Sequence, residues 1–137
     1  MYHMSLRINP PTKIFVSNSP IHGLGVFSKD FIEEGEIIEE SPIITLPINK
    51  GELSGILLDY RFNWPTGLDW QEQVVGLGFA SLYNHSENPN AYWVSDTQRK
   101  TFKFISKRVI NPMEEIFVYY GDSSYWNDGR NHIEVIS

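Results

Sequence analysis

The sequence predicts a mostly β domain made of several small sheets. Short apolar or alternating runs recur along the chain, and Gly, Pro, Asn and Asp separate them, which is typical of strands joined by turns. No segment shows a long 3.6-residue apolar period, so long amphipathic helices are not expected. The loops between the runs vary in length, which favours several small sheets over one regular barrel.

Eight runs are expected to form strands because they are short and bounded by turn residues. They are Lys13–Ser17, Gly25–Ser28, Glu36–Glu40, Ile43–Leu46, Tyr60–Trp64, Ala91–Ser95, Thr101–Ser106 and Ile116–Tyr120. Two other stretches have some helical character. Leu53–Asp59 is short and contains Gly55, and Val74–Tyr83 is expected to be an irregular loop with one helical turn.

The composition predicts one folded domain without a metal or a disulfide framework. A chain of 137 residues buries roughly two thirds of its unfolded surface without a covalent staple. There is no cysteine, which excludes disulfides, cysteine–zinc clusters and a cysteine nucleophile, and fits a reducing compartment. The four histidines are scattered without ligand spacing, so no metal site is expected.

Charge and hydropathy indicate an intracellular protein with a basic partner. No apolar run approaches the roughly 20 residues that span a bilayer. The N-terminus lacks the basic-then-apolar order of a secretory signal. We therefore expect a location in the cytoplasm, or in the host nucleus if the source is viral. The net charge of −6 disfavours nonspecific nucleic-acid binding and favours basic partners.

The first motif with possible chemistry is the run His22–Phe27, which contains Gly23-Leu24-Gly25. Two glycines around one residue let the backbone approach a ligand closely. The run is not a dinucleotide fingerprint, because a third glycine and a following helix are missing. Taken alone, it is more simply interpreted as a tight turn between strands.

The second motif is Asn84–Asn90, with the sequence Asn-His-Ser-Glu-Asn-Pro-Asn. Turn-forming residues make an ordered loop the simplest interpretation. Its match to the N-glycosylation pattern would be accidental in an intracellular protein. A serine hydrolase is not indicated, because the chain has no Gly-x-Ser-x-Gly elbow.

The third motif is Tyr119-Tyr120-Gly121, followed by Tyr125-Trp126. Tyrosines on a strand are usually half-buried packing residues, and this explanation suits Tyr119. A glycine directly after Tyr120 ends the strand and leaves room beside its ring. The aromatic pair near the end of the chain is costly to expose, so the tail is expected to fold back on the domain.

In this order the three motifs resemble those of the SET-domain family, whose short free-standing viral and bacterial members are the most similar. Gly23–Phe27 resembles its first motif, Asn84–Asn90 matches its Asn-His-Ser-x-x-Pro-Asn motif, and Glu115–Gly121 resembles its final strand. A fourth element, Asp59–Phe62, and the aromatic tail Tyr125-Trp126 also match. The resemblance spans nearly the whole chain.

The resemblance implies a fold of several small, mostly antiparallel sheets with a knot-like C-terminal segment threaded at the active site. It divides the chain into an N-terminal extension (1–12), the SET domain (13–121) and a short aromatic tail (122–137). The cysteine-rich zinc segments that flank many relatives are absent, so no metal is implied. The similar viral relatives of this size act as dimers, and a homodimer is expected here.

The implied activity is transfer of a methyl group from S-adenosylmethionine to a protein lysine, in a basic tail such as that of a histone or in a ribosomal or nucleoid protein. Tyr120 is the implied catalytic residue and also contacts the cofactor. The other implied cofactor-binding residues are Gly23, Leu24, Gly25, Asn84, His85 and Trp126. The implied substrate channel is lined by Tyr60, Trp93, Val118 and Tyr125. Ordinary core packing is the competing explanation for Trp93.

Two alternatives remain open from the sequence, a structural β domain whose motif matches are due to chance and a SET-like domain without catalysis. A SET-like domain that has lost catalysis would bind a basic peptide or the cofactor without methyl transfer. Val118 stands where relatives often have Phe or Tyr, at a position that influences how many methyl groups are added, so the sequence leaves mono-, di- and trimethylation open.

Overall fold

The computed structural model describes residues 6–46, 61–65 and 72–120, and strands make up about half of this part of the chain. The strands are β1 (Ile14–Asn18), β2 (Leu24–Ser28), β3 (Ile37–Thr45), β4 (Arg61–Trp64), β5 (Glu72–Gly76), β6 (Asn84–His85), β7 (Ala91–Asp96), β8 (Thr101–Ser106) and β9 (Glu115–Val118). The short 3₁₀ turn η2 (Ala80–Leu82) precedes β6. The expected mostly β fold of several small sheets is confirmed.

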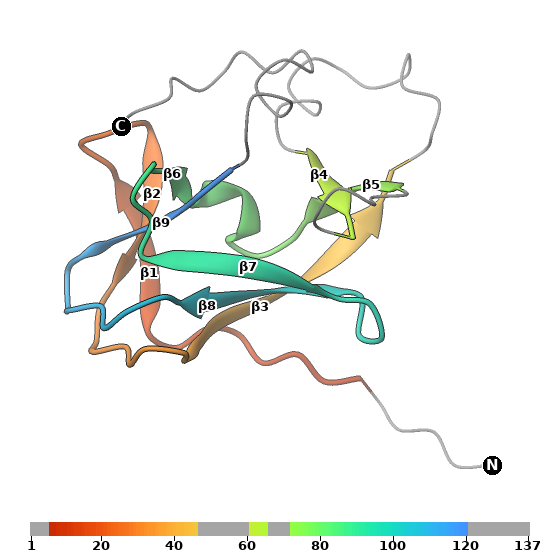
Figure 1. Cartoon of the computed structure of the whole chain (residues 1–137), viewed down its shortest axis with the longest axis horizontal. Helices are drawn as coiled ribbons and strands as arrows, with labels where there is room; N and C mark the ends of the chain where they lie inside the picture. The colour runs from red at the N-terminus through yellow and green to blue at the C-terminus, as the bar shows by residue number, and fades with distance from the viewer. Residues whose placement is uncertain (1–5, 47–60, 66–71, 121–137) are drawn as a thin grey trace.

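The strands form two sheets, which Figure 1 shows side by side. One has the order β1-β2-β9-β6 and the other the order β4-β5-β3-β8-β7. All pairs are antiparallel except β6 with β9, which run parallel. This parallel pair brings the second motif of the sequence beside the last strand.

The two strands expected at Glu36–Glu40 and Ile43–Leu46 are one continuous strand, β3. Its first half pairs with β8 and its second half, from Ile43, pairs with β5. Pro42 lies where the partner changes, opposite Thr101 at the first residue of β8. A proline lacks the N–H that a ladder needs, so it is tolerated where one ladder gives way to the next.

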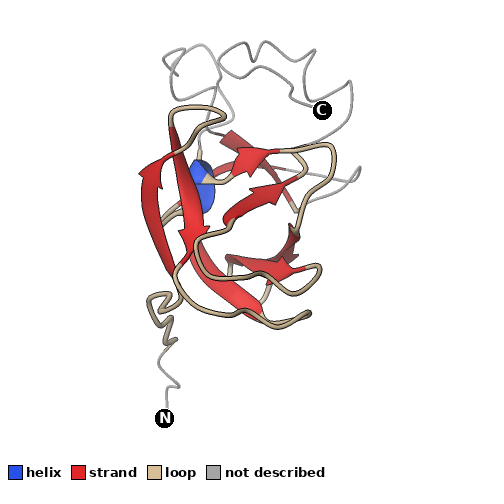
Figure 2. Cartoon of the chain, turned by 90° about the vertical axis from the view of Figure 1, so that its left-hand side faces the viewer, coloured by secondary structure: helices blue, strands red, loops and turns tan. Residues whose placement is uncertain are grey.

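The sequence predicts an irregular loop with one helical turn over Val74–Tyr83. For the first residues of this stretch the prediction is wrong. Val74 to Gly76 belong to β5, which joins β4 to β3. The predicted single helical turn is confirmed as η2, drawn in blue in Figure 2, where it contacts β2 of one sheet and β5 of the other. The possible helix Leu53–Asp59 lies outside the described residues. In the described ranges, no helix is long and apolar enough to span a bilayer.

The hydrophobic core lies between the sheets and is rich in aromatic rings. Tyr83 and Phe104 stack with ring centroids 4.3 Å apart, and both are almost fully buried. Phe102 packs against Phe62 and Trp64 at 4.9 and 5.3 Å. Burial of large rings dominates core energetics, so these contacts hold β4, β8 and the segment that leads into β6 together.

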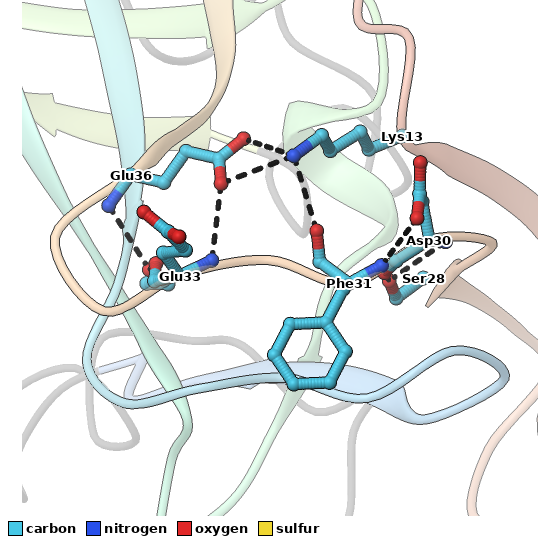
Figure 3. Close-up of polar contacts among 7 residues, drawn as sticks. Lys13, Ser28, Asp30, Phe31, Glu33 and Glu36 are labelled. Atoms are coloured by element: carbon cyan, nitrogen blue, oxygen red, sulfur yellow. Dashed lines mark hydrogen bonds and ion pairs between the residues drawn. The ribbon is translucent and has the colours of Figure 1, made fainter.

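The connection from β2 to β3 is held by Lys13, as Figure 3 shows. The Lys13 ammonium donates to the Phe31 carbonyl at 3.1 Å and contacts the Glu36 carboxylate at 2.9 Å. The hydrogen bond to Glu36 raises the pKa of Lys13. The same Glu36 carboxylate accepts the Glu33 N–H at 3.0 Å. Ion pairs near the surface stabilise a fold only slightly, so the main effect of these contacts is to tie Lys13 to the connection that leads into β3.

Candidate active site

The three sequence motifs meet around β9. Val26 of β2 pairs with Ile116, and Asn84 and His85 of β6 pair with Phe117 and Val118. In Figure 1, β9 accordingly passes between β2 and β6. The Gly23–Gly25 segment, the Asn-His pair and Tyr120 therefore come together although they are far apart in the sequence.

The side-chain amide of Asn84 ties two of these motifs together. Its Nδ2 donates to the backbone carbonyls of His22 at 3.0 Å and Leu24 at 3.2 Å, and to Glu115 Oε2 at 2.9 Å. Asn84 is 5% exposed, so these contacts are shielded from water. A buried acceptor that loses its donor costs about 1–3 kcal/mol. Asn84 therefore fixes the backbone on both sides of Gly23.

Glu115 is the acidic partner at the centre of this arrangement. Its Oε1 accepts the Ser19 hydroxyl at 2.8 Å while its Oε2 accepts Asn84. The Ser19 oxygen also accepts the Ile21 N–H at 3.0 Å, and the Ser19 N–H donates to the Gly23 carbonyl at 2.7 Å. One carboxylate thus connects the last strand with both ends of the turn before β2.

The two glycines of the first motif differ in why the structure disfavours a side chain at their positions. Gly23 has φ +47°, and a Cβ there would meet no atom within 4 Å. A Cβ on Gly25 would collide with the Glu115 carboxylate and lie 3.1 Å from the Ser19 Cβ. Leu24 between them is 49% exposed. Gly25 is therefore required by Glu115, whereas Gly23 borders open space.

We expect Gly25→Ala to destabilise the fold more than Gly23→Ala. The Glu115 carboxylate would have to give up its hydrogen bonds to Asn84 and Ser19 to make room, so the added methyl should cost about 3 kcal/mol. The Gly23 substitution carries only the cost of a left-handed backbone, about 1 kcal/mol. Urea unfolding of both variants measures the difference. A Gly25→Ala protein as stable as the wild type would contradict the arrangement around Glu115.

His85 connects the second motif to Tyr120. The backbone N–H of Tyr120 donates to His85 Nδ1 at 2.9 Å, and His85 Nε2 lies 3.2 Å from Glu87 Oε1. Because Nδ1 accepts, the proton of the neutral ring is at Nε2, where the Glu87 carboxylate accepts it. His85 is 3% exposed. The histidine thus fixes the backbone where the chain leaves β9.

The Tyr120 hydroxyl points back toward β6. It donates to the backbone carbonyl of Tyr83 at 2.5 Å. The Tyr120 ring is half-buried, packs against the core and lies 5.3 Å from the His85 ring. The Tyr120 hydroxyl proton is directed at the Tyr83 carbonyl, so the lone pairs of the hydroxyl oxygen point away from that carbonyl.

The residues expected to line a substrate channel are only partly described. Trp93 is half-buried, with its ring 5.4 Å from Phe62 and 6.1 Å from Phe104. Val118 is 1% exposed and lies opposite His85 in the parallel pair. The other expected residues, Tyr60, Tyr125 and Trp126, lie outside the described residues.

Sequence reasoning missed the polar residues that support the site. Ser19 and Glu115 have the contacts given above, and Asn90 accepts the Phe117 N–H at 2.8 Å while donating to the Glu115 carbonyl at 2.8 Å. Glu39 is a further buried acid, 3% exposed. The usable signal was an acidic residue inside an apolar strand, as in Ile37-Ile38-Glu39 and Glu115-Ile116. Within the described ranges, no group of three or more acidic or histidine side chains is arranged to hold a metal ion.

Comparisons with known proteins show which family this chain resembles. The model of the SET domain family matches residues 23–121. The chain is 30% identical over 118 residues to a histone-lysine N-methyltransferase of Schizosaccharomyces pombe described as specific for histone H3 lysine 37, covering 84% of this chain and 78% of the relative. The crystal structure of a candidate histone methyltransferase of Plasmodium falciparum superposes with a TM-score of 0.67 and 31% identity, covering 82% of this chain and 96% of that one.

The chain therefore belongs to the SET domain family, in the class of protein-lysine N-methyltransferases. The family match begins at the Gly23 turn and includes all three motifs gathered around β9.

Proposed function

We propose that this protein transfers a methyl group from S-adenosylmethionine to the side-chain amine of a lysine in a protein. The observation that supports it best is the gathering of the Gly23–Gly25 turn, Asn84, His85 and Tyr120 around β9. Gly23 borders open space and Leu24 is exposed beside it, which suits a ligand lying along this backbone. We assign Gly23, Leu24, Gly25, Asn84, His85 and Trp126 to cofactor binding.

The main task of the protein in this reaction is to position the lysine amine next to the cofactor. When bound, S-adenosylmethionine supplies a methyl group already activated by its sulfonium. A lysine amine has a pKa of about 10.4 in water and must lose its proton, which an apolar channel favours by disfavouring the charged form. The Tyr120 hydroxyl orients the amine, and aromatic faces stabilise the positive charge that develops on nitrogen. We place Tyr60, Trp93, Val118 and Tyr125 along this channel.

The proposed substrate is a lysine in a flexible basic tail, such as a histone tail. The fission yeast relative is described as acting on histone H3, and the net charge of −6 attracts a positive segment. A flexible tail lies along a sheet edge and reaches a narrow channel more easily than a lysine on a folded surface. A histone substrate would place the protein in the nucleus.

The experiment is transfer of a labelled methyl group to histone-tail peptides at several salt concentrations. Activity on a basic peptide should fall as ionic strength rises, because salt screens attraction at an exposed rim. It should survive a metal chelator. A folded acidic protein methylated equally well, without salt sensitivity, would contradict the proposed substrate. Cofactor binding without methyl transfer would instead indicate a catalytically inactive peptide-binding module.

We also propose that the catalytic domain spans 13–121, with an N-terminal extension (1–12) and a short C-terminal tail (122–137). The family match begins at residue 23, but β1 pairs along its whole length with β2, which supports including it. A homodimer is proposed because the short free-standing relatives of the resemblance form dimers and a two-fold pair is the commonest oligomer. The mass from light scattering at working concentration decides between dimer and monomer.

A further inference from the structure

Glu39 is a buried carboxylate that belongs to none of the three motifs. It lies in β3, where the register with β8 shifts between Ile37 and Glu39. Because of this bulge, both Ile38 and Glu39 point inward, at 6% and 3% exposed. Bulges re-aim side chains and are common beside functional sites. A carboxylate is costly to bury unless it is hydrogen-bonded, so its partners indicate its role.

Two hydrogen-bond partners of Glu39, Phe79 and Tyr83, stand at the two ends of one short turn. Oε2 accepts the Phe79 N–H at 2.9 Å, and Oε1 accepts the Tyr83 hydroxyl at 2.6 Å. The turn η2 lies between these residues. Gly78, with φ +67°, precedes it, and a Cβ there would meet the Glu39 carboxylate. One side chain therefore holds the segment 79–83 at both ends.

The hydrogen bond from Tyr83 to Glu39 has a fixed direction. Burial, together with the nearby carboxylate, raises the pKa of Tyr83 well above its usual value, so the phenol keeps its proton. Burial also raises the pKa of Glu39, which the Phe79 and Tyr83 hydrogen bonds oppose. The Tyr83 ring is further held by stacking on Phe104. Its position in the core is thus determined by packing and by one polar contact.

The segment 79–83 ends at the carbonyl that receives the Tyr120 hydroxyl, at 2.5 Å. We propose that Glu39 is a positioning residue for Tyr120, acting through the segment 79–83 and the Tyr83 carbonyl. This inference rests on the proposed function, because it concerns the geometry of the same site. Asn84 contacts Leu24 of β2 and Glu115 of β9, so the turn proposed to bind the cofactor should not depend on Glu39 in the same way.

The test is a double-mutant cycle between Tyr83 and Tyr120, with methyl transfer and cofactor affinity both measured. Tyr83→Phe keeps the ring and the carbonyl but removes the hydroxyl that Glu39 holds. Its kcat should fall about tenfold, because small misplacements of a catalytic group are costly, while the cofactor Kd stays within about twofold. In a Tyr120→Phe protein, the same Tyr83→Phe change should lower kcat no further.

Glu39→Gln is the second variant. Its kcat should also fall, while its cofactor Kd should stay close to that of the wild type. Glu40→Gln is the matched control, since Glu40 is the next residue of β3 and instead contacts Arg99 and Thr101. It should leave kcat unchanged. Equal losses from Tyr83→Phe with and without the Tyr120 hydroxyl would overturn this assignment alone. A wild-type protein that transfers no methyl group would overturn the proposed function and this assignment together.

Discussion

Replacing Tyr120 by phenylalanine should lower kcat about a hundredfold, which is the loss typical when one preorganised polar group at a reacting centre is removed. The hydroxyl is placed by the Tyr83 carbonyl at 2.5 Å, and the backbone of Tyr120 is held by His85 at 2.9 Å. Phenylalanine keeps the ring packing and the backbone contact. The change removes the hydroxyl that we propose orients the lysine amine, so kcat should fall far more than cofactor affinity.

The matched control for this prediction is Tyr92→Phe. Tyr92 lies on β7 and is 43% exposed, so the same loss of a hydroxyl there should change neither kcat nor stability. Steady-state kinetics and calorimetry of cofactor binding measure the two effects separately. A Tyr120→Phe variant with near-normal turnover would remove Tyr120 from the reaction.

Replacing Asn84 by alanine should weaken both the fold and cofactor binding. The change leaves Glu115 Oε2 and the His22 and Leu24 carbonyls without the donor they now share. Unsatisfied buried acceptors cost about 1–3 kcal/mol each, so we expect a loss of about 3 kcal/mol in unfolding free energy after partial relaxation. Because the same amide fixes the Gly23 turn, the cofactor Kd should rise at least about tenfold.

The control is Asn88→Ala, four residues further along the same motif. Asn88 is exposed, so its truncation should stay within about 0.5 kcal/mol of wild-type stability and leave the cofactor Kd unchanged. Urea unfolding and calorimetry provide both measurements. Equal cofactor affinity in the Asn84→Ala protein and the wild type would show that the cofactor binds elsewhere.

Local sequence patterns predicted the strands that have simple alternation and clear turns. Thr101–Ser106 was predicted with its observed bounds, and Ala91–Ser95 extends by one residue to Asp96. β5 and β6 were missed because Gly76 and Gly78 resemble a loop and Asn84-His85 is a two-residue strand. A strand that short exists only because β9 pairs with it, and that pairing is a long-range contact that no local pattern contains.

The sequence motifs predicted which residues belong to the site, but not the contacts between them. Ordered motifs predicted that Gly23, Asn84 and Tyr120 belong to one kind of site, and the structure brings their segments together around β9. The contacts between them were not predictable, since Asn84 and Glu115 are separated by 31 residues. The inward direction of Glu39 depends on a bulge in β3, which the sequence does not mark.

We expect this SET domain protein to methylate a lysine using the Tyr120 site. Mass spectrometry of histone-tail peptides incubated with the protein and methyl-labelled S-adenosylmethionine tests it most directly. We expect a labelled methyl group on one lysine side chain with the wild type, and about a hundredfold less label with Tyr120→Phe under the same conditions. Equal amounts of label with both proteins, or no label with either protein, would contradict methyl transfer at the Tyr120 site.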